Sequence, residues 1–493
     1  MNKKLTYLLT ASSIITLSQA AFAGTDTFFT PLTSSAVVAD PNSIAEMNSP
    51  WVAPAGIVQE NLTSMDEIEG DPEQTALRVP GTGTQASMWD MVAYDDKGKF
   101  AFIPHETPWG AGLSRYDIKN DVSEVLFAGD QLGATGNWES DWAAFDPATF
   151  TPNRTVLVAE EWSGEGRVME VLNPFAKVDR IQVRELESIA NVAHEGLRFG
   201  LDGRTLYFVD EWNSGSLYKF VTKKKGDYSL GQTFVLVVDA FAGDPAADYN
   251  QGVNASATRV GAATWVPITD AVGNKLTTVD PFRNGPTDDP RTSSITRGGR
   301  PAADEVNGTP YGRPEDMEIG TLANGHEVLY VTATSENAIY SVEFLDKTHA
   351  VVRVFASQTV TPKNLGHAAT TAALGSPDNL AQDALGNIYV VEDAPNASLV
   401  GGDIWFARDA NSDGVAESLD HFLSIQVHGS EATGMIFNPK DPTKFVVSVQ
   451  HPSSVDLGLP GSFGDALWQF DVSGVNADFT RALKKGPARG CGH

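Results

Sequence analysis

The stretch LDGRTLYFVDEW, residues 201–212, decides the fold that the sequence predicts. A turn of Asp, Gly and Arg leads into a short run of β-branched, aromatic and aliphatic residues, and the run stops at two acidic residues. Such a run is typical of a buried strand. The same arrangement recurs in DDKGKFAFIPHE (95–106), PNRTVLVAEEW (152–162), ANGHEVLYVTATSEN (323–337), ALGNIYVVEDAP (384–395) and DPTKFVVSVQHP (441–452).

A second strand-like stretch, such as GRVMEVLN or GSLYKFV, follows these runs. Hairpins that repeat at roughly 50 to 60 residues are typical of propeller blades. We therefore predict an all-β fold, a six-bladed β-propeller over residues 81–493, with an N-terminal extension (24–80) packed on it. The spacing breaks between Glu211 and Ser335, which predicts a long insertion over one face at about 222–308.

Bulk composition limits the classes of partner. The chain has 493 residues, 41% hydrophobic and 20% charged, and a net charge of -28. Such a charge disfavours nucleic acid and anionic lipid surfaces as partners, and we expect a monomer whose partner is a small molecule. Residues 1–23 combine Lys3, Lys4 and an apolar run with a small-residue cleavage site after Ala23. This is a Sec-type signal peptide and predicts a secreted or periplasmic protein.

The single cysteine, Cys491, excludes an intrachain disulfide and a cysteine-based metal site in the body of the chain. A metal would then be held mainly by oxygen ligands, with the nine histidines as the other source.

Acidic residues at the ends of the strand runs converge near the central channel of a propeller. Crowded carboxylates repel one another, and bound cations relieve that repulsion. The alternative is that these residues pair with Arg or Lys at blade edges. The residues concerned are Glu106, Glu160, Glu161, Asp210, Glu211 and Glu392.

The stretch GRPEDME places Arg313 beside Glu315 and Asp316. Carboxylate oxygens suit calcium, and the planar fork of arginine suits a phosphate. Alone, the stretch fits a salt-bridged loop equally well. The chain has no H-E-x-x-H, no G-x-S-x-G and no P-loop, so a zincin, a hydrolase with a nucleophile elbow and a P-loop enzyme are excluded.

In order along the chain, VAEEW, AHEG with LYKFV downstream, GRPEDME, SPDNLAQDALGNIYVVED and SEATGMIF with VSVQHPSS resemble the PhoX-type alkaline phosphatases. These are secreted, metal-dependent six-bladed propellers. The resemblance implies hydrolysis of phosphomonoesters at a cluster of Ca²⁺ and Fe³⁺, so the expected partner is a phosphorylated small-molecule substrate. It implies that Arg313 contacts phosphate and that Asn379 is a lesser polar contact. The metal ligands it implies are Glu160, Glu195, Glu315, Asp378 and Glu431.

Two features depart from the family pattern. Ala159 stands where the family usually has a cysteine that binds iron, and the signal peptide has a Lys-Lys pair instead of twin arginines. The sequence therefore predicts Ca²⁺ and leaves Fe³⁺ open.

The stretch DANSDGVAESLD, residues 409–420, reads as a loop like that of an EF-hand. Asp409, Asn411 and Asp413 fall at positions 1, 3 and 5, Gly414 at position 6 and Asp420 at position 12. This pattern predicts a structural calcium, and the alternative is an ordinary turn between strands.

Two other functions remain open. SPDNLAQDALGNIYVVED also resembles the blades of gluconolactonase-like propellers, which suggests a calcium-dependent lactonase. With Ala159 in place of the iron ligand, a non-catalytic calcium-binding propeller is the third reading. Trp109, Trp162 and Trp212 follow acidic strand ends, and we interpret them as packing residues rather than a stacking surface for substrate.

Overall fold

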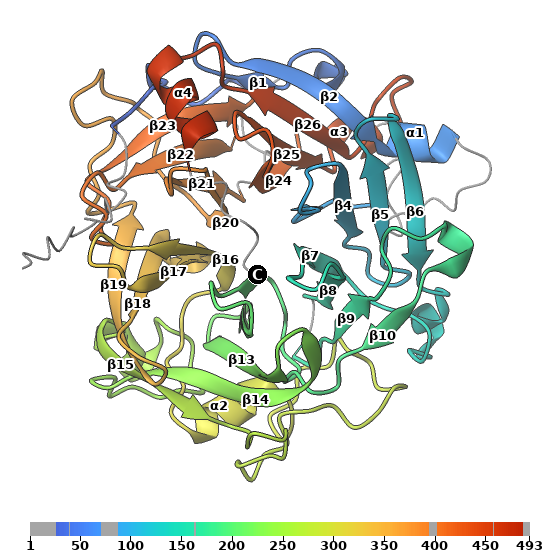
Figure 1. The fold of residues 1–493 in the computed structure, drawn as a ribbon, viewed down its shortest axis with the longest axis vertical. Helices are drawn as coiled ribbons and strands as arrows, with labels where there is room; N and C mark the ends of the chain where they lie inside the picture. The colour runs from blue at the N-terminus through green and yellow to red at the C-terminus, as the bar shows by residue number, and fades with distance from the viewer. Residues whose placement is uncertain are drawn as a thin grey trace, which may run out of the picture.

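The computed structural model describes residues 26–38, 40–70, 87–161, 164–393, 402–456 and 458–486. Within these residues, the strands form five antiparallel sheets arranged like propeller blades around a common axis (Figure 1). The predicted signal peptide (1–23), Trp162 and Cys491 lie outside the described residues.

Two of the sheets are meanders of four consecutive strands. The first contains β3 (Ala93–Tyr94), β4 (Phe100–His105), β5 (Gly112–Asp117) and β6 (Val122–Ala128). The second contains β7 (Phe145–Phe150), β8 (Val156–Glu160), β9 (Val168–Val171) and β10 (Val183–Glu185). In both, the run expected from the sequence is the second strand.

A nine-stranded sheet corrects the prediction of six separate blades. Its members are β11 (Leu197–Phe199), β12 (Thr205–Val209), β13 (Leu217–Lys224), β14 (Asp227–Val238), β15 (Gly261–Pro267), β16 (Pro314–Thr321), β17 (Glu327–Ala333), β18 (Ala338–Phe344) and β19 (His349–Ser357). Strand β15 pairs with both β14 and β19, so it joins two four-stranded units into one sheet. It thereby covers two outer strand edges that would otherwise expose backbone groups.

The last two sheets each take a strand from the N-terminal part of the chain. One contains β20 (Pro377–Gln382), β21 (Ile388–Glu392), β22 (Asp403–Arg408), β23 (Ser418–Ile425) and β1 (Trp51–Val52). The other contains β24 (Glu431–Phe437), β25 (Lys444–Gln450), β26 (Ala466–Asp471) and β2 (Val58–Ser64). The segment that the sequence suggested as an extension therefore pairs within the ring, with β2 beside β26 (Figure 1).

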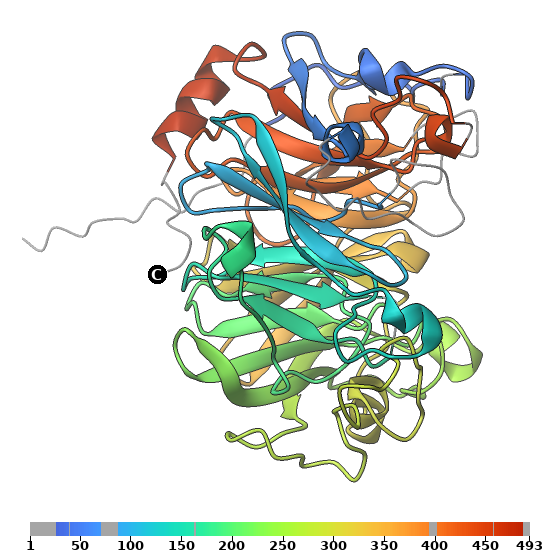
Figure 2. The same cartoon turned by 90° about the vertical axis from the view of Figure 1, so that its right-hand side faces the viewer.

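Helical segments are short. They are α1 (Met65–Gly70), α2 (Gly299–Glu305), α3 (Ser453–Asp456), α4 (Ala477–Lys485), η1 (Ala45–Met47), η2 (Leu132–Thr135), η3 (Val178–Arg180), η4 (Gly252–Ser256) and η5 (Thr334–Glu336). The side chain of Asn476 caps α4 by accepting the N–H groups of Asp478 and Phe479. Helices α4 and α2 lie on opposite faces of the ring (Figure 2).

The insertion is expected at about 222–308, and the structure places its start later than residue 222. Residue 222 lies within β13, and residues 227–238 form β14 of the sheet. The chain that runs over one face therefore starts after β14 and includes η4, β15 and α2.

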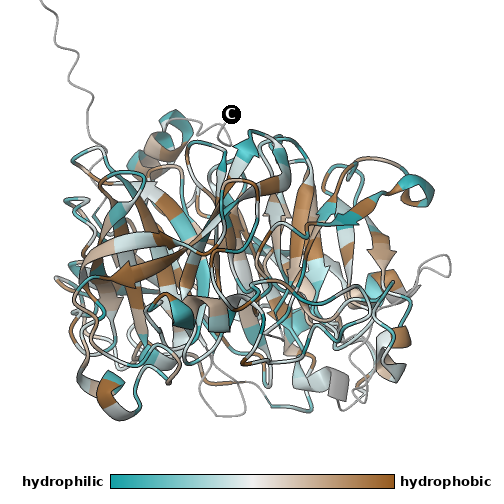
Figure 3. Cartoon of the chain, turned by 90° about the horizontal axis from the view of Figure 1, so that it is seen from below, coloured by the Kyte–Doolittle hydropathy of each residue, from teal (hydrophilic) through white to brown (hydrophobic). Residues whose placement is uncertain are grey.

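Hydrophobic cores fill the space between neighbouring sheets, and many strands carry hydrophobic stretches, brown among teal and white ones (Figure 3). Between the first two sheets, the rings of Phe102 and Phe150 stack with centroids 6.1 Å apart. Close packing of this kind gives a rigid scaffold. The first strand of each unit lies nearest the axis, so residues at its start can meet there.

Candidate active site

The nine-stranded sheet holds two units, β11–β14 and β16–β19, and each of the other four sheets is one unit. Six acidic residues, one from each unit, lie at or just before the first strand of their unit. We call them the inner ring: Asp90, Asp146, Glu195, Glu315, Asp378 and Glu431. Oxygens of Glu195, Glu315 and Asp378 lie within 4.8 Å of one another, and so do oxygens of Asp90, Asp146 and Glu106. Four of the predicted ligands therefore belong to the ring, and three of these four come together in one group.

A repeated backbone conformation precedes the inner ring. In five units, the residue two positions before the acid is in the left-handed region. These residues are Met88 (φ 51°), Ala144 (φ 43°), Arg313 (φ 49°), Ser376 (φ 44°) and Gly429 (φ 75°). Non-glycine residues rarely adopt this conformation, and it is enriched at functional sites.

A second set of acidic residues is hydrogen-bonded, through the backbone, to the residues two positions before the inner ring. The carbonyl of Ala144 accepts the N–H of Glu161 at 2.9 Å, and that of Ser376 accepts the N–H of Asp393 at 2.9 Å. The corresponding carbonyls in two other units hold Glu106 and Glu211 at 3.0 and 2.9 Å. We call Glu106, Glu161, Glu211 and Asp393 the strand-end acids. In the unit of β16, Thr334 takes this position.

Arg313 supplies a cation at this acidic centre. Its guanidinium pairs with Glu211, lies 3.3 Å from Glu315 Oε1 and 4.0 Å from Asp393 Oδ2, and its side chain is 39% exposed. Burial alone would lower the pKa of Arg313, but the charges of Glu315 and Glu211 outweigh burial and raise that pKa. The side chain is therefore charged at any physiological pH and remains partly accessible.

Burial and mutual repulsion make the carboxylates weak acids. Burial, followed by neighbouring carboxylates, raises the pKa of Glu195 and of Asp378 well above the usual range. Burial raises the pKa of Asp90 to about 6, and burial with Asp393 raises that of Glu431 to about 7. Such shifts mark a cluster whose charges the protein alone does not neutralise.

Several buried carboxylate oxygens have no hydrogen-bond donor. They are Asp146 Oδ2, Glu161 Oε2 and Asp378 Oδ1, together with Glu315 Oε1, which is ion-paired with Arg313 at 3.3 Å but accepts no hydrogen bond from the described residues. An unsatisfied buried acceptor is costly, and more so when it carries charge. Cations with oxygen ligands, bound in the two carboxylate groups, would satisfy Asp146 Oδ2 in one group and Glu315 Oε1 and Asp378 Oδ1 in the other.

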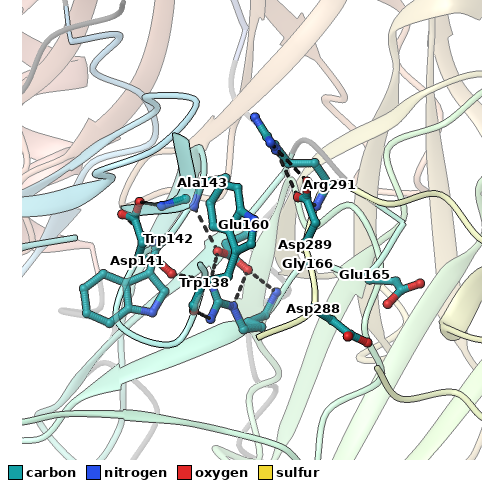
Figure 4. Close-up of polar contacts among 12 residues, drawn as sticks. Trp138, Asp141, Trp142, Ala143, Glu160, Glu165, Gly166, Asp288, Asp289 and Arg291 are labelled. Carbon is teal, nitrogen blue, oxygen red and sulfur yellow. Dashed lines mark hydrogen bonds and ion pairs between the residues drawn. The ribbon is translucent and has the colours of Figure 1, made fainter. Parts of the chain in front are cut away.

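Glu160, a predicted ligand, does not join this cluster. Its carboxylate accepts bonds from Arg167 Nη2 at 2.6 Å, Arg167 Nε at 2.8 Å and Ala143 N–H at 3.0 Å (Figure 4). Successive residues of a strand point to opposite sides, so Glu161 faces the ring and Glu160 faces away.

The same alternation sorts the other expected strand-end carboxylates. Asp210 is paired with Arg300, and Glu392 accepts a bond from the indole N–H of Trp405 at 2.8 Å. Of the six expected to converge, Glu106, Glu161 and Glu211 do so, with Glu211 paired to Arg313 at the centre, whereas Glu160, Asp210 and Glu392 bond to protein groups outside it.

Asn379 is buried beside the ring rather than open to it. Its side-chain oxygen accepts bonds from the Thr433 hydroxyl and the Gly434 N–H, so it braces β20 against β24. Its amide nitrogen has no hydrogen-bond partner among the described residues, and its role as a lesser polar contact stays a prediction.

The loop at 409–420 does not gather the predicted calcium ligands. The Asp409 side chain accepts the N–H of Gly414 at 3.0 Å, and that of Asn411 accepts the N–H of Asp413 at 2.9 Å. Asp420 lies in β23, where it bonds to Ser418 Oγ and lies 3.3 Å from Arg408. The loop is a turn between β22 and β23, and Asp420 is not part of it.

Sequence reasoning missed Asp90 and Asp146 of the inner ring, as well as Asp393. A signal existed for the first two, because an acid lies a few residues before the turn of every strand run. Asp393 directly follows Glu392, as Glu161 follows Glu160. His451 was also missed; its Nε2 lies 3.2 Å from Glu431 Oε2.

A separate cavity of about 400 Å³ opens at the other mouth of the channel. Its lining includes Tyr94, Phe199 and Phe437 and contains no member of the inner ring or the strand-end acids. We therefore take the crowded carboxylates, and not this cavity, as the candidate active site.

The sequence and the fold both match known proteins. The model of the family described as "Alkaline phosphatase PhoX" matches residues 105–453. No curated protein matches the sequence. The fold is similar to that of Pseudomonas fluorescens PhoX in complex with vanadate, with a TM-score of 0.60 and 15% identity over 92% of this chain and 99% of that chain.

More distant folds include a Bacteroides thetaiotaomicron protein of unknown function (TM-score 0.40, 11% identity, 84% of this chain and 76% of that chain). Virginiamycin B lyase from Staphylococcus aureus has a TM-score of 0.39 and 12% identity, over 84% of this chain and 99% of that chain. These structural likenesses concern the fold alone, and the last two carry no argument. Because the family model covers more than half of the sequence, the protein belongs to the PhoX alkaline phosphatase family of phosphoric-ester hydrolases.

Proposed function

We propose that this protein hydrolyses phosphomonoesters in the central channel, where the inner ring and the strand-end acids hold cations and Arg313 contacts the phosphoryl group. One observation carries the proposal. Each four-stranded unit contributes a carboxylate to the ring, several of their oxygens have no donor, and an arginine lies among them.

The donor set supports calcium. Every unpartnered atom in the two carboxylate layers is an oxygen, and hard oxygen ligands suit Ca²⁺. Ala159 lies within β8, is buried in the core and offers no ligand atom, and the described residues include no cysteine. We therefore propose Glu195, Glu315 and Asp378 as one group of ligands, Asp90, Asp146 and Glu106 as a second, and Ca²⁺ as the ion.

Bound cations would stabilise the negative charge that develops on the phosphoryl oxygens. Arg313 adds a directed contact: Glu211 and Glu315 position its guanidinium, and the exposed part can donate two hydrogen bonds to one phosphoryl group. A carboxylate-lined channel without cations would repel a phosphate dianion, so ion binding must precede substrate binding.

His451 is a further proton carrier at this centre. Burial would lower its pKa, but the bond to Glu431 raises the pKa to about 9. The imidazolium therefore keeps its proton on Nε2 near neutral pH, where it offsets the charge of Glu431.

We also propose that the protein is exported and is secreted or periplasmic. Among the described residues, no helix is long and apolar enough to cross a membrane. A PhoX-family protein that acts on phosphorylated small molecules outside the cytoplasm would meet abundant calcium there, which agrees with the oxygen-only donor set.

The substitution Arg313→Ala tests the proposal. We expect kcat/KM for p-nitrophenyl phosphate to fall by roughly 10²- to 10³-fold, as when one directed donor to a developing oxyanion is removed. Arg313→Lys, which keeps the charge but not the fork, should restore only part of the activity. Circular dichroism and calcium content should match the wild type.

Full turnover of p-nitrophenyl phosphate by Arg313→Ala would contradict the assignment of Arg313. A lactone assayed beside the phosphomonoester tests the reaction class. Hydrolysis of the lactone with no phosphatase activity would favour a lactonase, and no activity on either substrate would favour a binding protein.

A further inference from the structure

Trp212 differs from the packing residue that its sequence position predicted. Its side chain is 49% exposed, whereas Trp138, Trp265 and Trp405 are almost completely buried. A large aromatic side chain that stays exposed in a fixed position marks a contact surface more often than a core position.

One face of the Trp212 indole is held by the protein. The guanidinium of Arg300 lies over the ring, 4.7 Å from its centroid. Arg300 is itself fixed by two hydrogen bonds to Asp210, at 2.6 and 2.7 Å, and by one to Ser293 Oγ at 3.0 Å. The ring is therefore fixed on one face, while about half of the side chain remains open to solvent.

Trp212 is directly connected to the proposed phosphate contact. Its carbonyl accepts the N–H of Arg313 at 3.1 Å. The preceding residue, Glu211, pairs with the Arg313 side chain. A phosphoryl group held by Arg313 would therefore have its ester substituent near the rim to which Trp212 belongs.

The chain that follows β14 builds this rim. Arg300 and Ser293 both come from it, as does Tyr249, whose N–H donates to Asn213 O at 2.7 Å. A Cβ on Gly312 would lie 2.6 Å from the Tyr249 ring, so the two segments are in close contact. The insertion therefore contacts the backbone next to Trp212, at Asn213, and next to Arg313, at Gly312.

We propose that Trp212 is a stacking surface for the leaving group, and that the enzyme prefers phosphomonoesters whose leaving group is a planar aromatic ring. This inference rests on the proposed phosphatase function. A rigid indole offers an open π face with little entropy left to lose, which favours a flat ring over a flexible aliphatic group.

The test compares p-nitrophenyl phosphate with glycerol 3-phosphate in the wild type, Trp212→Ala and Trp212→Phe. We expect Trp212→Ala to lower the ratio of the two kcat/KM values about tenfold, mainly through KM for the aryl ester. Trp212→Phe keeps a ring and should retain most of the ratio. The intrinsic reactivities of the two esters cancel, because only the change in their ratio between variants is compared.

Ile295→Ala serves as the matched control, because Ile295 is 90% exposed on the same insertion. Its ratio should equal that of the wild type. Turnover of both esters with a ratio unchanged by Trp212→Ala, or an equal loss for both, would overturn the stacking surface while leaving the phosphatase intact. If the wild type turns over neither ester, the phosphatase proposal fails, and the stacking surface fails with it.

Discussion

Glu160 and Glu161 are neighbours in sequence but lie in opposite electrostatic environments. Glu160 is buried against Arg167, which donates to both of its oxygens. Glu161 faces the channel, where Glu211, Glu106 and Glu315 surround it and one of its oxygens has no donor. Asp210 and Glu211 repeat the contrast, with Arg300 as the partner of Asp210.

The contrast assigns different roles to the two neighbours: the arginine-paired carboxylate stabilises the fold, and the carboxylate in the channel belongs to the proposed site. A buried carboxylate that has its own arginine needs nothing from outside the protein. A carboxylate surrounded by others keeps an unfavourable charge until a cation binds. Strand alternation, which assigns successive residues to opposite sides, creates both environments from a single acidic pair.

The largest expected effect follows from breaking the buried ion pair between Glu160 and Arg167. Glu160→Gln would leave the guanidinium of Arg167 buried without a counter-charge, and we expect the free energy of unfolding to fall by about 3–5 kcal/mol. Urea unfolding of the metal-free protein measures this change. Glu161→Gln is the matched variant; it removes a repelled charge and should cause no such loss. Equal destabilisation by both variants would contradict the contrast.

A loss of activity should follow from changing the ring. Glu315→Gln removes a charge and a proposed ligand oxygen, and we expect kcat/KM for p-nitrophenyl phosphate to fall roughly 10²- to 10³-fold. Glu318→Gln, on the same strand, is the control. Glu318 lies 3.4 Å from Arg198 and lines the cavity at the other mouth, so its activity should stay close to that of the wild type. Similar losses in the two variants would argue against a local role of Glu315.

The stability of the metal-free protein should depend on pH in a specific direction. The folded state raises the pKa of Asp90 to about 6 and that of Glu431 to about 7, above the usual values of about 4 in an unfolded chain. Between these values the two carboxyl groups hold more protons in the folded protein than in the unfolded chain, so their contribution to stability falls as pH rises.

Thermal unfolding from pH 4 to pH 8 in the presence of a chelator measures this dependence. The melting temperature should decrease across that range, and added calcium should reverse the decrease most strongly at the higher pH. A melting temperature that rises with pH in the chelated protein would contradict the unneutralised ring.

The smallest effect is expected at the loop after β22. The side chain of Asp413 accepts the N–H of Val415, at 3.0 Å. Asp413→Asn should therefore change the free energy of unfolding by no more than about 1 kcal/mol and leave the calcium content unchanged. Loss of one calcium ion per chain would instead support the EF-hand-like interpretation of residues 409–420.

Much of this architecture could be predicted from the sequence. The repeated strand runs gave the all-β propeller, and Glu195, Glu315, Asp378 and Glu431 are members of the inner ring. The resemblance implies Glu160 as a ligand, whereas Glu161 faces the axis. A linear motif does not tell which of two adjacent residues points inward. The joining of two units by β15 depends on long-range pairing, which no local pattern reveals.

The central claim is that cations bind to the inner ring, whereas carboxylates that are paired with arginine, such as Glu160 with Arg167, bind none. Elemental analysis of the purified wild type, Glu315→Gln and Glu160→Gln tests it most directly. We predict calcium in the wild type, at least one fewer ion per chain in Glu315→Gln, and wild-type content in folded Glu160→Gln. Unchanged metal content in Glu315→Gln, or no bound metal in the wild type, would contradict the account.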